Sequence, residues 1–263
     1  MNVHKKKLIC ELMGGIGNQL FILSTATALA SKYDRELIVV FKGVCHYTYH
    51  NDFRSTIFRN VPTIMDVPED KVDTLVIKDY TNKLINIDLA HVTGDVRLDG
   101  YFQTAKYFDE YRTLILKNLY LTDNELALCD KVIHDLRVQS KGRSIIGMQV
   151  RRGDYIGLGW TLPITYYIES MGKFPNSLIV VTTDDQQWVI NNIPNSVVLR
   201  DLPAYLQLII LSKLDGLIMS NSTFGWWIAY IGGLTNVIVP YPWFKGVSYN
   251  EDIYDIRWTK KAV

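Results

Sequence analysis

The sequence has few cysteines, and no two of them have the spacing of metal ligands. Its 263 residues include three cysteines, Cys10, Cys45 and Cys129, and no CxxC pair. An odd and widely spaced set of this kind is not typical of a disulfide framework or a zinc site, so we expect a reducing compartment. The histidines add no metal site, because the two that lie four residues apart, His46 and His50, fall in an apparent loop.

An excess of charge of either sign is also absent. Lysine and arginine together number 28, against 27 aspartate and glutamate residues. A chain this close to neutrality has no overall field that attracts nucleic acid or an anionic membrane, so a bound anion must be held by a local site. We therefore expect no nucleic-acid partner.

Long hydrophobic runs are missing as well. The stretch 216–244 contains no charged residue, but Ser220 to Thr223, a glycine pair and two prolines interrupt it before the roughly 20 apolar residues of a membrane span accumulate. The basic N-terminus has no long apolar run behind it and does not resemble a signal peptide. We expect no transmembrane segment and a cytoplasmic location, with peripheral contact to a membrane as an alternative.

What the sequence contains instead is an alternation of strands and helices. A strand at 7–13, a glycine turn, a helix at 19–32 and a strand at 36–41 form a βαβ unit, which requires a parallel sheet. Short strands follow at 74–80 and 96–102. A helix at 122–136 comes next, and its Thr122 and Glu125 match a capping box.

The second half repeats this alternation. Its five predicted strands are 144–150, 177–185, 196–201, 216–222 and 236–240, with helical patterns between them. The polar segment 137–143 is the best candidate for a domain boundary. We therefore predict an α/β fold with one domain at 1–140 and another at 141–263, each with a parallel sheet.

Polar residues follow several of these strands, at the edge where open parallel sheets bind ligands. Arg151, Arg152 and Asp154 come directly after the strand 144–150. Guanidinium groups match phosphate geometry, and two of them beside a glycine suit a diphosphate whose charge grows as it departs. A solvated charged turn is the alternative. The Arg-Gly-Asp adhesion tripeptide formed here is frequent by chance.

Two further strand ends carry polar groups. Residues 220–223, Ser-Asn-Ser-Thr, precede a helix, where they could hold a phosphate together with the free N–H groups or could simply cap the helix. Asp184 and Asp185 end the strand 177–185; one carboxylate could accept hydrogen bonds from a base such as guanine, or both could cap the next helix.

The first glycine turn is Gly14-Gly15-Ile16-Gly17, followed by Asn18 and Gln19. Its backbone could approach a ligand closely, and the two amides could contact a polar ligand. The pattern is not GxGxxG and no acid ends the second strand, so dinucleotide binding is disfavoured. A purely structural turn is the alternative.

Taken in order along the chain, these motifs resemble those of the α-1,2-fucosyltransferases. The matching segments are "LMGGIGNQLF", "LDGYFQTAKYF", "VRRGDY", "VVTTDDQQW", "SNSTFGWW" and "VIVPYPWF", and they cover nearly the whole chain. The resemblance implies a GT-B fold, with two Rossmann-like domains facing each other across a cleft. It implies an inverting transfer of L-fucose from GDP-fucose to the 2-hydroxyl of a galactoside in a glycan, with no metal and no other cofactor.

The resemblance also implies roles for individual residues. Arg151 would bind the β-phosphate, with Arg152 as its partner or scaffold, and Asp184 would bind the guanine edge. The remaining predicted substrate contacts are Ser222 and Thr223 at phosphate oxygens, Asn221 and Phe224 beside them, and Gly15, Gly17, Asn18 and Gln19 on the other domain.

One position departs from the family pattern. The family reads His-x-Arg-Arg-x-Asp, and Gln149 stands at the histidine position. If this side chain contacts the nucleotide, it can form hydrogen bonds but cannot become cationic. Transfer of another deoxy-sugar, such as rhamnose, or non-catalytic binding of a sugar nucleotide or glycan are therefore alternatives. Asp154 is the candidate for the base, or it orients an arginine.

Overall fold

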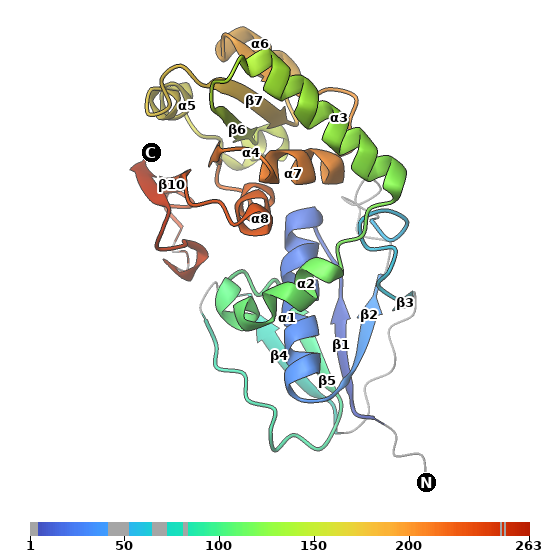
Figure 1. Cartoon of the computed structure of the whole chain (residues 1–263). Coiled ribbons are helices and arrows are strands. Elements are labelled where there is room, and N and C mark those ends of the chain that lie inside the picture. The colour runs from blue at the N-terminus through green and yellow to red at the C-terminus, as the bar shows by residue number, and fades with distance from the viewer. Residues whose placement is uncertain (1–4, 42–52, 65–72, 81–83, 248, 250) are drawn as a thin grey trace. The chain divides into compact units, whose positions relative to one another are not determined.

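The chain forms two compact units in the computed structural model (Figure 1), which describes residues 5–41, 53–64, 73–80, 84–247, 249 and 251–263. Unit 1 comprises Met1–Tyr120 and Asn250–Ile253, and unit 2 comprises Leu121–Tyr249 and Tyr254–Val263. Each unit is an α/β body with its own parallel sheet, as the alternation of strands and helices predicts.

The sheet of unit 1 has the strand order β3-β2-β1-β5-β4, and every neighbouring pair is parallel. Its strands are β1 (Lys7–Glu11), β2 (Glu36–Val40), β3 (Thr63–Ile64), β4 (Leu75–Asp79) and β5 (Val96–Gly100). Figure 1 shows two helices on one face of this sheet, α1 (Ile16–Lys32) and α2 (Arg112–Lys117). Short 3-10 helices lie at Ala105–Tyr107, Asp109–Tyr111 and Glu251–Ile253.

The sheet of unit 2 has the order β11-β10-β9-β6-β7-β8 and is also parallel throughout. Its strands are β6 (Ile145–Val150), β7 (Leu178–Thr183), β8 (Ser196–Val198), β9 (Gly216–Ile218), β10 (Val237–Tyr241) and β11 (Thr259–Ala262). The five predicted strands are present. The central strand β6 is buried at every residue, as expected for a parallel strand covered on both faces.

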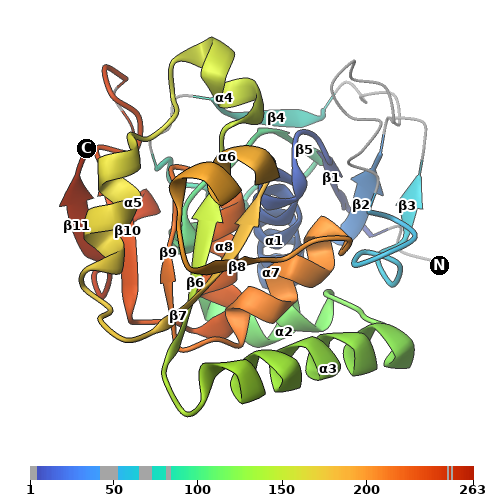
Figure 2. The same ribbon diagram turned by 90° about the horizontal axis from the view of Figure 1, so that it is seen from above.

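Helices cover both faces of this sheet (Figure 2). They are α3 (Asp123–Ser140), α4 (Gly153–Leu158), α5 (Ile164–Met171), α6 (Gln186–Asn192), α7 (Ala204–Ser212) and α8 (Thr223–Gly232). On one face, Met148 of β6 clusters with Tyr166 of α5 and Val189 of α6. On the other face, a Cβ atom at Gly147 would lie 3.2 Å from Leu211 of α7, so the missing side chain lets α7 pack closely.

The helix α3 corrects the predicted domain boundary. Its capping box is confirmed, since Thr122 Oγ1 accepts from the Glu125 N–H and Glu125 accepts from the Thr122 N–H. However, α3 belongs to unit 2, and the units divide after Tyr120 and not at 137–143. Arg137 explains this: its two Nη atoms donate to Asp215 at 2.7 and 2.8 Å, which binds the C-terminal end of α3 to the start of β9.

Candidate functional site

Three neighbouring strands of unit 2 end at one edge of the sheet. β6 lies between β7 and β9, and Val150 at its end pairs with Thr183 at the end of β7. The polar residues that follow these strands, including Arg151, Asp184 and Ser220, therefore come together at this edge. This confirms the predicted convergence of the three motifs.

Arg151 lies between two carboxylates. Its Nη2 atom is 2.7 Å from Asp154 Oδ1, and its Nη1 atom is 3.0 Å from Asp184 Oδ2. Its guanidinium carbon lies 5.4 Å from the centre of the Tyr155 ring. The Arg151 side chain is 38% exposed, so it is oriented by its neighbours and still accessible to an anion from solvent.

Arg152 has different surroundings. Its Nε atom lies 3.0 Å from Asp185 Oδ2, and its guanidinium carbon lies 4.2 Å from the centre of the Trp188 ring on α6. The two adjacent arginines therefore turn to different carboxylates and different rings. This arrangement favours a scaffold role for Arg152 over membership in one clamp with Arg151.

Asp184 joins the two arginines. Its Oδ1 atom accepts from the Arg152 backbone N–H at 2.8 Å, while Oδ2 faces Arg151. A Cβ atom at Gly153 would lie 2.7 Å from Asp184 Oδ2, so glycine makes room for this carboxylate. The contact of Asp184 with guanine stays a prediction. Asp185 caps α6 by accepting from the Trp188 N–H at 3.0 Å, so the capping alternative holds for this residue.

Gln149 braces the loop before α8. It is 4% exposed, and its Oε1 atom accepts from both the N–H and the hydroxyl of Ser220, at 3.1 and 2.7 Å. A Cβ atom at Gly225 would lie 3.0 Å from the same oxygen, so α8 packs directly against it. The acceptor atom of Gln149 is therefore engaged within the protein, and its predicted contact with the nucleotide stays a prediction.

The N-terminus of α8 carries the predicted phosphate contacts. Ser222 caps the helix by accepting from the Phe224 N–H at 3.4 Å, and Thr223 is the first helical residue. The first turn contains no acidic residue, so its N–H groups and the positive end of the helix dipole favour an anion. The capping interpretation is confirmed, and the contact of Ser222 and Thr223 with a phosphate stays a prediction.

Asn221 connects the N-terminal end of α8 to α4 and to the segment that follows it. Its Nδ2 atom donates to the Trp160 carbonyl at 2.9 Å, and its own carbonyl accepts from the Tyr155 hydroxyl at 3.1 Å. Burial raises the pKa of Tyr155 to about 12, so this phenol stays protonated and remains a donor at neutral pH. Asn221 thus has a structural contact on both its backbone and its side chain.

The predicted contacts in the first glycine turn lie in unit 1. Gly14 has a φ of +74°, and a Cβ atom there would lie 2.8 Å from Asn18 Nδ2, so the turn requires glycine. The Gln19 side chain is buried and donates to the Gly14 carbonyl at 2.8 Å, while Asn18 Oδ1 accepts from Gln103 at 2.8 Å.

Of the two remaining predicted glycines, Gly17 is buried within α1, and Gly15 is exposed and caps the helix. The side-chain amides of Asn18 and Gln19 thus help to hold the glycine turn, and Gly15 is an exposed predicted contact. The predicted residues form two groups, one in each unit.

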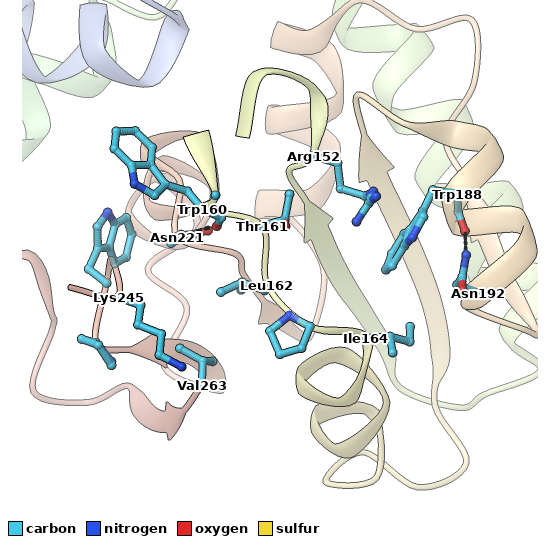
Figure 3. A pocket seen from close by; sticks show the side chains of 14 residues that line it. Arg152, Trp160, Thr161, Leu162, Ile164, Trp188, Asn192, Asn221, Lys245 and Val263 are labelled. Atoms are coloured by element: carbon cyan, nitrogen blue, oxygen red, sulfur yellow. Dashed lines mark hydrogen bonds between the residues drawn. The ribbon is translucent and has the colours of Figure 1, made fainter. Parts of the chain in front are cut away.

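A pocket of about 520 Å³ opens within unit 2 beside Arg152 (Figure 3). The segments 159–164 and 242–245 border it, together with Trp188 and Asn192 of α6. Arg151 is not among the lining residues. The pocket itself was not predicted, although Trp160 in its lining lies soon after the arginine motif in the sequence.

Within the described part of the chain, no group of three or more His, Cys, Asp or Glu side chains is placed to hold a metal ion. Cys10 and Cys129 are buried free thiols, while Cys45, His46 and His50 lie outside the described residues. No helix in the described ranges is both long enough and apolar enough to cross a membrane.

The model of glycosyl transferase family 11 matches residues 67–262. The chain belongs to this family. One relative is the O-antigen biosynthesis glycosyltransferase WbnK of Escherichia coli, which is 24% identical over 89% of this chain and 94% of the relative. An α-1,2-colitosyltransferase of Escherichia coli is 24% identical over 96% of this chain and 98% of the relative.

The similarity extends to animal enzymes and to solved structures. The galactoside α-(1,2)-fucosyltransferase 2 of Pongo pygmaeus is 25% identical over 94% of this chain and 77% of the relative. The fucosyltransferase NodZ from Bradyrhizobium superposes with a TM-score of 0.63, at 17% identity, over 94% of this chain and all (100%) of NodZ. This likeness concerns the fold and confirms the predicted GT-B type.

Two ring contacts at the sheet edge of this family 11 chain were not predicted. They are those of Tyr155 with Arg151 and of Trp188 with Arg152. Tyr155 and Trp188 are the last residues of the matched segments "VRRGDY" and "VVTTDDQQW". Nothing in the one-dimensional pattern indicates that their rings face the guanidinium groups and not the core.

Proposed function

We propose that this family 11 chain is an inverting glycosyltransferase that moves L-fucose from GDP-fucose to the 2-hydroxyl of a galactoside in a glycan. The observation that carries the proposal is the placement of Arg151 at the same sheet edge as the uncharged N-terminus of α8. A nucleoside diphosphate gains negative charge as it departs. A guanidinium and a helix N-terminus both supply positive potential that stabilises this charge.

In this reaction the acceptor hydroxyl attacks the anomeric carbon from the side opposite the phosphate. The bond from that carbon to the phosphate oxygen breaks, and GDP leaves with the bonding electrons. Arg151 and the positive end of the α8 dipole, where Ser222 and Thr223 lie, stabilise the charge that develops on the β-phosphate. Other transferases use a divalent cation for this purpose, and here the arginine takes its place.

Asp154 and Asp184 both contact Arg151, and Asp154 is the more exposed of the two. One of its oxygens lies 2.7 Å from Arg151 Nη2, and its side chain is 57% exposed. This contact supports the role of orienting Arg151. The second carboxylate oxygen can still accept the proton of the acceptor hydroxyl, so both roles belong to the proposal.

A second candidate donor is the nucleotide of colitose, the 3-deoxy counterpart of fucose. The observation that favours it is the similarity to an α-1,2-colitosyltransferase over 96% of this chain. Gln149 at the family's histidine position does not decide between the two sugars, because its acceptor oxygen binds Ser220. Both donors would use the same diphosphate contacts.

Nucleotide binding is the first test. GDP should raise the melting temperature of the chain, and Arg151→Ala should abolish most of this rise. Arg143→Ala is the matched control, because Arg143 precedes β6 at the opposite edge of the sheet and donates to the Ser140 carbonyl. Stabilisation by UDP or NAD in place of GDP would contradict the proposal.

Turnover separates an enzyme from a binding protein. GDP-fucose and GDP-colitose should be compared with the same β-galactoside acceptors, and product linkage determined by NMR. We expect an α-1,2-linked product with one of the two donors, and about 100-fold or greater loss of kcat/KM in Arg151→Ala. Binding of GDP without turnover of either donor would favour the non-catalytic alternative.

The acceptor glycan and the place of the reaction belong to the same proposal. We expect the chain to work in the cytoplasm on a saccharide, with peripheral contact to a membrane if that saccharide is lipid-linked. Cell fractionation of the tagged chain, with and without a salt wash, tests this expectation.

A further inference from the structure

The pocket beside Arg152 lies within unit 2 and is large enough for a small molecule. Its volume of about 520 Å³ falls within the roughly 300–1,000 Å³ of ligand sites in proteins. Arg151 does not contribute to its lining, whereas Arg152 does. The pocket is therefore on the side of the sheet edge to which Arg152 turns. Arg151, Ser222 and Thr223, the contacts proposed for the diphosphate, do not line it.

Flat apolar groups provide much of the lining. Trp160 and Trp188 border the pocket as partly exposed rings, together with Pro163 and Pro242, while Trp243 in the lining is almost fully buried. Trp160 is held in place by Phe244, whose ring centre lies 4.5 Å away, and Trp188 by the guanidinium of Arg152. Indole faces of this kind pack against the apolar C–H face of a sugar ring, with polar groups at the rim fixing its orientation.

The polar part of the lining is cationic. Arg152 and Lys245 line the pocket, and no aspartate or glutamate is among the lining residues that the structure describes. Figure 3 shows Arg152 and Lys245 on opposite sides of the pocket. Asp185 engages only the Nε atom of Arg152, so its two Nη atoms donate to no acceptor among the described residues. Lys245 makes no ion pair with any carboxylate in the described ranges.

Amide side chains complete the rim. Asn192 and Asn221 line the pocket, and both donate to tryptophan carbonyls, at 2.8 Å to Trp188 and 2.9 Å to Trp160. These bonds hold the two tryptophans on either side of the opening. The result is a pocket with rigid aromatic walls and two cations in its lining, of which Arg152 is paired with Asp185 through Nε alone.

We propose that this pocket binds a saccharide unit that carries an anionic group, either a carboxylate or a phosphate. The indole faces take the apolar face of the ring, and the Arg152 Nη atoms and Lys245 Nζ take the anion. A neutral sugar would offer no charged acceptor to Lys245 or to the Nη atoms of Arg152, which Asp185 does not engage. The site goes beyond the proposed transfer reaction, since its ligand is neither the nucleotide nor the leaving diphosphate.

Binding is tested with three probes that differ in charge. They are methyl β-D-glucuronide, glucose 6-phosphate and the neutral methyl β-D-glucoside, each titrated against the full chain by saturation-transfer NMR and by tryptophan fluorescence. We expect saturable binding of at least one anionic probe, about ten-fold tighter than the neutral one, since a charged hydrogen bond contributes about that factor. The glucuronide and the phosphate distinguish the two sources of negative charge.

Lys245→Met is the decisive variant, because Lys245 is exposed and its loss should not disturb folding. It should reduce the preference for the anionic probe to about two-fold or less, and Lys245→Glu should abolish it. Lys173→Met, an exposed lysine outside the pocket, should leave the preference unchanged.

Three results would overturn the proposal. They are equal binding of the neutral and anionic probes, absence of saturable binding, and displacement of the saccharide by GDP, which would assign the pocket to the nucleotide. GDP should bind to Lys245→Met as it does to the unmodified chain. If GDP fails to stabilise the unmodified chain, the proposed transfer reaction is contradicted. The proposal of a saccharide site in the pocket does not depend on that result.

Discussion

Asp154 occupies a position from which it can orient Arg151 or accept a proton. We predict that the Asp154→Asn variant loses about ten-fold in kcat/KM and keeps the shape of its pH profile, because the amide oxygen can still accept from Arg151. Steady-state kinetics between pH 5 and 9 provide the measurement. A loss of 100-fold or more, together with disappearance of the acidic limb of the profile, would show that Asp154 is the general base and not a positioning residue.

Gln149 holds Ser220 in place through its side-chain Oε1 atom and its backbone carbonyl, both of which accept from the Ser220 N–H at 3.1 Å. We predict that Gln149→Leu lowers the free energy of unfolding by about 1–3 kcal/mol, since the buried Ser220 hydroxyl loses its acceptor while the N–H keeps the backbone carbonyl. Urea unfolding followed by circular dichroism measures the difference. Gln186→Leu, at an exposed position on α6, is the matched control and should change stability little. Equal stability of the two variants would argue against the brace.

The contacts of single residues at the sheet edge could not be predicted from the sequence pattern. Two adjacent arginines, Arg151 and Arg152, suggested one clamp, and the structure separates them onto different carboxylates and different aromatic rings. Pairing with Asp184 and Asp185 depends on side chains more than 30 residues away in the chain. Local secondary-structure propensity does not indicate these pairings.

At the scale of secondary-structure elements, Asp215 connects α3, β6 and the start of β9. It accepts two bonds from Arg137 and one from the Ile145 N–H at 2.7 Å. The Arg137 guanidinium, and to a lesser degree the Ile145 N–H, hold the pKa of Asp215 below its usual range. Three elements that are distant in the sequence are thus joined at one carboxylate.

This linkage has a predictable pH dependence. Because the pKa of Asp215 is lowered in the folded state, its contribution is fully present above the unfolded pKa of about 4 and is lost as the pH falls through the folded value. We predict that Asp215→Asn costs about 1 kcal/mol at pH 7, a value reduced by solvent screening of this partly exposed pair. Chemical unfolding at pH 7 and at pH 3 should show the difference shrinking at the lower pH.

Asp135→Asn is the control for this prediction. Asp135 pairs with Lys131 within α3 and is exposed, so its substitution should have the smaller effect at pH 7. A loss in Asp215→Asn that is unchanged at pH 3 would mean that packing, and not the ion pair, joins these elements.

Two of the elements that sequence reasoning missed share a physical cause. The helix α4 spans Gly153–Leu158 with glycines inside it and exposed apolar side chains at Ile156 and Leu158, so it has no helical apolar stripe. The strand β11, Thr259–Ala262, is a polar edge strand that pairs only with β10. Both elements form through their tertiary neighbours and not through a periodic pattern.

At the scale of the whole molecule, the proposed chemistry rests on arginine and a helix dipole in place of a metal. We predict that GDP-dependent stabilisation and turnover persist in the presence of EDTA, and that added Mg²⁺ or Mn²⁺ changes kcat by no more than about two-fold. Kinetics after dialysis against chelator provide the measurement. Restoration of a lost activity by one divalent cation would contradict the prediction.

The sequence by itself determined the two parallel sheets and the edge at which the site forms. Alternating buried strands and amphipathic helices leave little choice of fold class, and parallel strands carry their carboxyl ends to one edge. The glycine turn, the arginine motif, the acidic pair and the α8 cap therefore fell at the expected edges, and their order predicted the family.

Only the tertiary structure decided which groups meet there. In the folded chain, the Arg137–Asp215 pair joins α3 to unit 2, and the guanidinium of Arg152 packs on Trp188. The acceptor oxygen of Gln149 binds Ser220. The tertiary structure also formed a cationic, tryptophan-lined pocket from segments far apart in the chain. Each of these features depends on contacts between distant residues, whose geometry follows from packing and not from the periodicity of any one segment.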